Sequence, residues 1–499
     1  MDAFFAGLLA LADPSMLGLL LLATLGGVLI GALPGLNATT GAALLLPFTL
    51  TMEPVAAIAM LTAIYCSATF AGAITAILIN TPGTSASATT CLDGYPLAQR
   101  GEAGRALGLA VVASTIGGVL SVFALMLAAP LLGRAAYNFA PPEYFALTVF
   151  GLSMLATIGD GAPIRNLIAG AFGVLLATVG TDLMTSVERF TFGWPELADG
   201  IGFVPVMIGV FGISELLVQA SNLHIRRERV TMKAIRLPSR EDYRRVWKTI
   251  LRSSGIGTFI GILPAEGATV ASMIGYNEAK RWSKTPEEFG KGAVEGIAGS
   301  EAANNSATGG AMVPTLALGI PGSPTAAVIL AGLMVHGLRP GPTMFTEQAG
   351  FAFAIFWSML LVNLLFLAVG LFGAKLFARV TLIPVQVLWP CVFIFSIVGA
   401  YALDQSMLDV WVALVSGVLG FFMRRYGFSV VPLAIGLILG AMLEQRLGQS
   451  MVMLDGQWWL LFTRPLALVF FILTALALFG PSLWGRLFKQ RAPLASTGE

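Results

Sequence analysis

Long apolar stretches recur along this chain, and a transmembrane helix needs about 20 such residues. They run from Met16 to Leu33, Val55 to Ile79, Leu107 to Leu132, Phe351 to Phe372 and Leu466 to Phe479. Of the 499 residues, 56% are apolar and 11% are charged, whereas a soluble domain has about 25% charged residues. We therefore expect an all-α polytopic membrane protein with about 11 or 12 transmembrane helices.

Glycine and proline are abundant for a helical protein, with 57 and 26 residues. Transmembrane helices tolerate both residues where neighbouring helices or water satisfy the freed backbone groups. We therefore expect some helices to be broken or re-entrant. The formal net charge is only +2, so nothing indicates nucleic-acid binding, which requires a clustered basic face.

Lysine and arginine are unevenly distributed along the chain. None occurs before Arg100, while Asp2, Asp13 and Glu53 do. Cytoplasmic loops carry the excess of lysine and arginine, so we expect a periplasmic N-terminus. The segment 222–252 is strongly basic, which indicates a cytoplasmic loop, although a patch that binds anionic lipid has the same charge.

The assignment of segments to the two sides of the membrane predicts four parts of the chain. Residues 1–221 form a first membrane half, 222–252 a basic cytoplasmic linker, 253–485 a second membrane half and 486–499 a cytoplasmic tail. The first half begins outside and ends inside, so it crosses the membrane an odd number of times. The second half then enters with the opposite orientation.

Two sequence blocks recur in the same order in both halves. Gly31-Ala-Leu-Pro followed by Ala38-Thr39 matches Gly261-Ile-Leu-Pro followed by Ala268-Thr269. Ser67-Ala-Thr lies fifteen residues ahead of a Pro-Gly pair, and Ser306-Ala-Thr lies fifteen residues ahead of another. We interpret the halves as two inverted structural repeats, and such repeats with interrupted helices indicate a transport site near the middle of the bilayer.

The repeated blocks combine helix breaks with small polar side chains. Helix breaks leave amide groups that suit an anion and carbonyl groups that suit a cation. Neutral hydroxyl and amide side chains can hold a carboxylate, and their oxygens can join carbonyls around sodium. The alternative is that small polar residues only hold transmembrane helices together. The predicted substrate- and ion-binding residues are Asn37, Thr39, Thr40, Asn80, Thr81, Pro82, Gly83, Thr84, Ser85, Glu266, Gly267, Thr269, Asn304, Asn305, Ser306, Pro321, Gly322 and Ser323.

Acidic residues near these blocks are candidates for coupling transport to an ion. Ionisable side chains at membrane depth are costly and therefore mark function, and Asp93, Glu266, Glu295 and Glu301 lie close to the blocks. Glu266 is the preferred candidate because it follows the second Leu-Pro pair. For Asp93, which precedes Gly94-Tyr95-Pro96, a cap at the end of a loop is the equal alternative. We expect no cofactor, but a coupling cation, either a proton or sodium held at the unwound segments.

The same motifs resemble a known family of membrane proteins. Asn80-Thr-Pro-Gly, Asp93-Gly-Tyr-Pro, Glu301-Ala-Ala-Asn-Asn, Pro321-Gly and His336-Gly-Leu-Arg-Pro-Gly resemble the large permease subunit of tripartite tricarboxylate transporters, the TctA family. The resemblance runs over about residues 15 to 440. One departure is Ala265-Glu266-Gly267, where the family commonly has a glycine-rich stretch.

The resemblance implies a secondary transporter of the bacterial inner membrane rather than an enzyme. Its substrate would be a di- or tricarboxylate or a related small organic anion, taken up by symport with sodium or protons. The implied partners are a small membrane subunit and a periplasmic solute-binding protein. An anion channel without ion coupling is the alternative, because the same helix breaks could line a selectivity filter.

Overall fold

Helices make up nearly all the regular structure of the computed structural model of this chain. It describes residues 2–33, 36–157, 162–182, 184–221, 238–263, 267–380 and 385–489. Within these ranges the one sheet is a ribbon of two antiparallel strands, β1 (Gly180–Thr181) and β2 (Glu188–Arg189). Gly180 pairs with Arg189, and Thr181 pairs with Glu188. The predicted all-α fold is confirmed.

Residue contacts divide the chain into two compact units, and each unit takes segments from both halves of the sequence. The first unit comprises residues 1–138 and 201–426, and the second comprises 139–200 and 427–499. These units cut across the halves 1–221 and 253–485, which remain predictions about an internal repeat. All of the matched sequence blocks lie in the first unit.

Helices from the first part of the chain alternate with short breaks in the first unit. The elements are α1 (Asp2–Ala10), α2 (Pro14–Gly31), α3 (Ala38–Leu45), η1 (Leu46–Thr51), α4 (Pro54–Ile79), η2 (Ser85–Ser87), α5 (Ala88–Leu97), η3 (Ala98–Glu102), α6 (Ala103–Ala136), α9 (Phe203–Met207), η6 (Ile208–Ile213) and α10 (Ser214–Ser221). Pro14 and Pro54 stand at the start of α2 and α4, where the missing amide hydrogen costs nothing.

The second part of the chain supplies the other helices of this unit. They are α11 (Arg240–Ile262), α12 (Gly267–Trp282), η7 (Pro286–Glu288), α13 (Val294–Leu318), α14 (Pro324–Val335), η8 (Pro342–Phe345), α15 (Ala349–Val380), α16 (Val385–Asp404) and α17 (Met407–Arg425). Ser239 and Asp242 begin α11 by bonding each other's backbone amide, the reciprocal pattern of a capping box. Residues 240–252 of the predicted linker are therefore helical, and residues 222–237 lie outside the described ranges.

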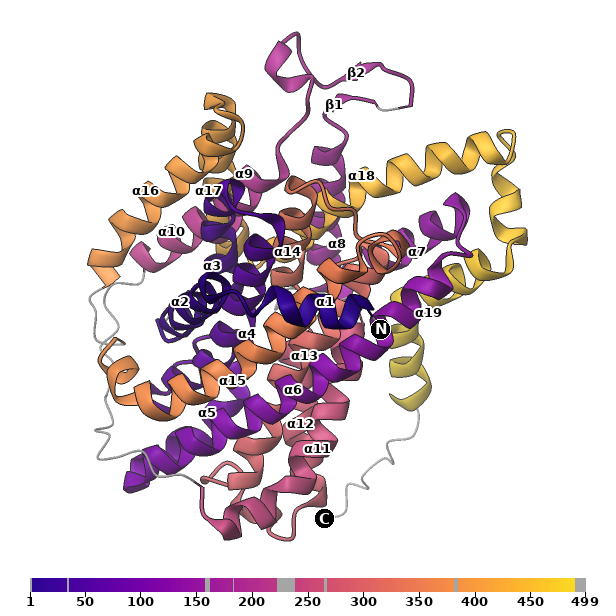
Figure 1. The fold of residues 1–499 in the computed structure, drawn as a ribbon. Coiled ribbons are helices and arrows are strands. Elements are labelled where there is room, and N and C mark those ends of the chain that lie inside the picture. The colour runs from indigo at the N-terminus through magenta and orange to yellow at the C-terminus, as the bar shows by residue number, and fades with distance from the viewer. Residues whose placement is uncertain are drawn as a thin grey trace, which may run out of the picture. The chain divides into compact units, whose positions relative to one another are not determined.

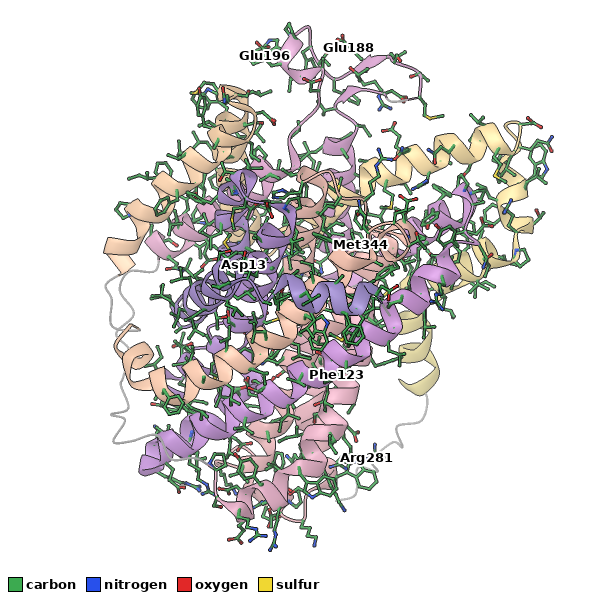
Figure 2. All side chains as sticks on the ribbon, in the orientation of Figure 1. Asp13, Phe123, Glu188, Glu196, Arg281 and Met344 are labelled. Carbon is green, nitrogen blue, oxygen red and sulfur yellow. The ribbon has the colours of Figure 1, made fainter. Side chains whose placement is uncertain are left out.

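The second unit is smaller. It contains α7 (Pro141–Ser153), η4 (Met154–Thr157), α8 (Pro163–Ala177), the β1–β2 ribbon, η5 (Pro195–Leu197), α18 (Val430–Met453), η9 (Trp458–Thr463) and α19 (Pro465–Lys489). Two ion pairs join its separate segments, Glu143 to Arg464 at 2.5 Å and Glu444 to Arg189. Glu188 and Glu196 lie on the segment that carries the ribbon (Figure 2). Residues 490–499 of the predicted tail lie outside the described ranges.

Helices α4 and α13 form the centre of the first unit. Most residues of α4 and nearly all of α13 are buried. Helices α2 and α15 pack on α4, and α11 and α6 pack on α13, with α6 and α15 crossing the middle of the unit in Figure 1. On the outer surface, Phe123 of α6 is exposed (Figure 2). Exposed apolar side chains of this kind suit contact with lipid.

Seven described helical segments are long and apolar enough to cross a membrane, which supports a polytopic membrane protein. This is fewer than the predicted 11 or 12 spans. Five shorter apolar segments add to the seven, among them Pro324–Val335. Helix α13 is not among these apolar segments, because it contains many small polar residues. It is nevertheless almost wholly buried within the protein.

The α2–α4 and α11–α13 contacts use matching residues. A side chain at Gly31 would place its Cβ 2.3 Å from the carbonyl oxygen of Ala68, and one at Gly261 would place it 2.6 Å from that of Ala307. One turn earlier, Gly27 lies against Ser67 and Gly257 against Ser306. Glycine at these positions lets the backbones approach closely, as in other membrane helix pairs.

Candidate functional site

The first helix break lies between α4 and η2. Asn80 ends α4 with φ 50°, in the left-handed region, which asparagine tolerates better than most residues. Pro82 and Gly83 follow, and the Thr84 side chain then accepts a hydrogen bond from Ser87 N at the start of η2. The predicted residues 80–85 therefore form a true interruption of the helix.

The second break lies between α13 and α14 and has the same order of parts. Gly319 ends α13 with φ 72°. Pro321 and Gly322 follow, and the Ser323 side chain accepts a hydrogen bond from Ala326 N at the start of α14. A left-handed cap, a Pro-Gly pair and a hydroxyl cap thus recur in both breaks, while the sequence blocks predict only that the helices break here.

The glycine of each Pro-Gly pair packs closely against backbone atoms from its own half of the chain. A Cβ added at Gly83 would lie 2.4 Å from the carbonyl oxygen of Gly31 and 2.7 Å from Cα of Gly72. A Cβ added at Gly322 would lie 2.9 Å from the carbonyl oxygen of Gly261 and 2.7 Å from Cα of Ala311. Both breaks therefore require glycine for the same steric reason.

The two Leu-Pro segments lead into α3 and α12. Asn37 caps α3, since its Oδ1 accepts a hydrogen bond of 2.9 Å from Thr40 N. Gly267 is the first residue of α12. Glu266, the preferred coupling residue, lies outside the described residues, and its role stays a prediction.

Helix starts from opposite halves meet in two crossed contacts. Thr39 Oγ1 in α3 lies 2.8 Å from Thr325 Oγ1 in α14. Thr269 Oγ1 in α12 lies 2.9 Å from Ser85 Oγ at the start of η2. Thr39 and Thr269 occupy matching places in the repeated block, so in each contact the helix after a Leu-Pro pair meets the helix start after the Pro-Gly pair of the other half. We call these the two crossed contacts.

Four of the predicted residues, Thr39, Ser85, Thr269 and Ser323, take part in contacts between the halves. Tyr65 of α4 adds a link, because its hydroxyl lies 2.9 Å from Ser323 Oγ. The groups in these contacts are neutral hydroxyls at or next to helix starts. Such groups can bind an anion without a buried basic side chain.

Other predicted residues lie elsewhere in the same unit. Thr40 Oγ1 donates to the carbonyl of Phe211 at 3.1 Å, and Thr81 Oγ1 donates to that of Ile79 at 3.2 Å. Ser306 donates to a carbonyl of its own helix and sits in the α11–α13 contact. These three side chains are satisfied by the backbone.

Asn304 and Asn305 lie within the buried middle of α13, not at its break. Asn304 Nδ2 donates to the carbonyl of Thr69 in α4 at 3.5 Å. Within the described residues, Asn304 Oδ1 and both polar atoms of the Asn305 side chain have no hydrogen-bond partner. Buried amides of this kind call for a ligand or a structural explanation.

The acids near the blocks have different surroundings. Asp93 Oδ1 accepts hydrogen bonds of 2.8 and 2.9 Å from the amides of Gly292 and Ala293, which begin α13. Its carboxylate thus binds the backbone just before a helix from the other half of the chain, not the end of its own loop, and a coupling role for Asp93 stays a prediction. Glu295 pairs with Arg245 at 3.3 Å. Glu301 is fully buried and belongs to neither arrangement.

Sequence reasoning missed Gly27, Gly257, Tyr65 and Thr90 as residues of this region. The two glycines are themselves a matched pair with the same spacing as Gly31 and Gly261, so a longer comparison of the halves would have found them. Tyr65 and Thr90 carry no such signal, because their partners are more than 200 residues away.

Comparisons with known proteins place most of the chain in one family. The family described as "Tripartite tricarboxylate transporter TctA family" matches residues 17–435. No solved structure gives a significant match to this chain.

Two proteins of Agrobacterium vitis are similar to this chain. The "Uncharacterized 52.8 kDa protein in TAR-I ttuC' 3'region" is 40% identical over 441 residues, which cover 88% of each protein. The "Uncharacterized protein in TAR-II ttuC' 3'region" is 37% identical over 211 residues, covering 42% of this chain and 87% of that protein. The family match and the long relative agree in extent, and this chain belongs to the TctA family of tripartite tricarboxylate transporters.

Proposed function

We propose that this chain is the permease subunit of a secondary active transporter in the bacterial inner membrane. It imports a small organic anion, a di- or tricarboxylate or a related carboxylate, by symport with sodium or a proton. It receives this anion from a periplasmic solute-binding protein and works with a small membrane subunit. Family membership supports the transporter class; the residues of this chain support the anion and its path.

The observation that carries the proposal is the pair of crossed contacts. Thr39 with Thr325, and Thr269 with Ser85, place helix starts and hydroxyls from both halves together. Helix starts attract negative charge, and hydroxyls hydrogen-bond carboxylate oxygens. Because each contact joins parts from opposite halves, a movement of one half past the other would open and close it. The predicted path therefore runs along these two contacts.

Two oppositely oriented repeats supply the movement in this proposal. The matching contacts of Gly31 and Gly261 support two copies of one packing unit, and inverted copies are a common design of carriers with broken helices. Lys280 and Arg281 end α12 on what would be the cytoplasmic side, and the Arg281 side chain is 73% exposed (Figure 2). The N-terminus would lie in the periplasm and the C-terminus in the cytoplasm.

Uptake into membrane vesicles tests this function. The complete transporter, with its membrane and binding subunits, is reconstituted and supplied in turn with radiolabelled citrate, malate and succinate. We expect saturable uptake of at least one anion that requires the binding protein and an inward sodium or proton gradient. Anion flux that is independent of both would instead support the channel, and absence of flux for carboxylates of every size tried would contradict the proposed substrate class.

A further inference from the structure

Glu301 is a buried acid without a basic partner in the part of the chain that the structure describes. Its side chain is 0% exposed. Glu301 Oε1 accepts a hydrogen bond of 2.5 Å from Thr90 Oγ1, and Oε2 accepts one of 2.9 Å from Ser114 Oγ. Hydroxyls alone do not balance a buried charge, and an unpaired one costs several kcal/mol. The charge of Glu301 therefore lacks its counterpart.

Two arginines on the neighbouring helices are already paired with other acids. Arg105 of α6 pairs with Asp242 and Glu102. Arg245 of α11 pairs with Glu288 and Glu295. None of the described ion pairs includes Glu301.

The other titratable groups close to Glu301 do not carry positive charge. Cys91 lies near it on α5. Asp93 of the same helix accepts hydrogen bonds from the amides of Gly292 and Ala293 just before α13, and Tyr276 of α12 lies near Asp93. These groups leave the charge of Glu301 unbalanced.

Two oxygen atoms that lack a hydrogen-bond partner in the described parts of the chain belong to residues on the same face of α13 as this acid. Asn304 and Asn305 follow Glu301 by three and four residues, which places all three on one face of α13. Their side chains are 0% and 1% exposed, and Oδ1 of each has no hydrogen-bond partner among the described residues. The Asn304 side chain also reaches the Glu301 carboxyl. Each orphaned buried acceptor costs about 1–3 kcal/mol, a cost that a cation would remove.

We propose that Glu301, Thr90, Ser114 and the amide oxygens of Asn304 and Asn305 form a sodium site. All of these ligands are oxygens, which hard cations prefer. One carboxylate balances a single positive charge, whereas a divalent ion would leave a buried excess. The site rests on the proposed function in one respect, since sodium held here would be the coupling ion.

The position of the site explains how sodium could act on the helices. Glu301 and both asparagines belong to α13, Thr90 belongs to α5 and Ser114 belongs to α6. The ligands are closed off from solvent, so sodium enters only when these helices separate. Bound sodium then holds α5, α6 and α13 together, which links ion occupancy to the arrangement of the two halves.

Thermal unfolding of the purified full-length chain tests the site without any organic anion. Tryptophan fluorescence is followed during heating in detergent, at fixed pH and ionic strength, while choline chloride is replaced by sodium chloride. We expect the unfolding midpoint to rise and saturate with sodium, as mass action requires of a ligand of the folded state. Glu301→Gln should abolish the rise, and Ser114→Ala should increase the half-saturating sodium concentration roughly tenfold.

Glu295→Gln is the matched control, because it makes the same change on the same helix outside the site. It should keep the sodium-dependent rise even if its midpoint in choline is lower. If Glu301→Gln does not fold, Ser114→Ala and Thr90→Val replace it in the test. Each should need a higher sodium concentration than the wild type for half of the rise in unfolding midpoint. Potassium chloride in place of sodium chloride controls for general salt effects.

Three results would overturn the site. The first is a wild-type unfolding midpoint that does not change with sodium, and the second is an equal rise of the midpoint in Glu301→Gln. The third is a rise of the midpoint that lower pH alone produces, which would mean that a proton neutralises Glu301. Because no anion is used, the two proposals can fail separately. Sodium binding without carboxylate uptake would refute the proposed function and leave the sodium site standing.

Discussion

Uptake should fall by about 100-fold or more when alanine replaces Gly83 or Gly322, while the chain still inserts into the membrane. The reason is steric, because the new Cβ would lie 2.4 Å from a backbone oxygen at Gly83 and 2.7 Å from backbone atoms at Gly322. Backbone cannot move aside as a flexible side chain can. The Pro-Gly break would be displaced, and the helix start beyond it would lose its place in the crossed contact.

Gly255→Ala is the control for this experiment. Nothing lies within 4 Å of a Cβ added there, and alanine is a better helix former than glycine. Uptake by this variant should equal that of the wild type when normalised to the amount of protein in the membrane. Normal uptake by both Gly83→Ala and Gly322→Ala would remove the Pro-Gly breaks from the transport path.

Alanine should lower the thermal stability at the buried glycines of α2 and α11 and should preserve or raise it at glycines of the same two helices that have open space beside them. Gly31→Ala and Gly261→Ala push a methyl group to 2.3 and 2.6 Å from carbonyl oxygens of α4 and α13, and overpacking of this kind costs about 1–3 kcal/mol. Gly26→Ala and Gly255→Ala meet no atom within 4 Å and should gain up to about 1 kcal/mol from helix propensity.

The measurement is the thermal unfolding midpoint of each purified variant in the same detergent. We expect Gly31→Ala and Gly261→Ala to unfold below the wild type, by similar amounts because their contacts match. Gly26→Ala and Gly255→Ala should unfold at or above the wild-type temperature. A lower midpoint for only one of the two buried glycines would show that the matched contacts are not equivalent in energy.

The positions of the helix breaks could be predicted from the sequence. Pro-Gly pairs inside apolar runs remove an amide donor and permit unusual backbone angles, and the structure has left-handed caps at Asn80 and Gly319. The all-α class followed from the apolar runs for a similarly local reason. Both predictions depended only on residues that are close together in the sequence, which is why they could be made without the structure.

Packing between distant segments could not be predicted. The contact of Thr39 with Thr325 joins residues 286 positions apart, and nothing local to either threonine identifies the other. The division into two compact units has the same origin, since residues 139–200 group with 427–499 through tertiary contacts. The burial of α13 is a further case, since its small polar residues do not predict a helix that lies almost wholly inside the protein.

The role that we infer for Glu301 depends on its burial, which the sequence does not show. In the sequence it is one of several acids near the repeated blocks, and Glu266 looked better placed. The structure gives Glu301 two hydroxyl donors and no basic partner among the described residues, and depth of this kind is not visible in sequence. Glu266 retains its predicted role in ion coupling, which Glu266→Gln would test through the ion dependence of uptake.

Disulfide trapping of the two crossed contacts tests the central claim most directly. In full-length protein from which Cys66, Cys91 and Cys391 have been removed, one variant carries Thr39→Cys with Thr325→Cys and another carries Ser85→Cys with Thr269→Cys. We expect mild oxidation in native membranes to join both pairs and stop uptake, and reduction to restore it. Failure of both pairs to join, or full uptake by the joined protein, would contradict a path built from breaks of the two halves.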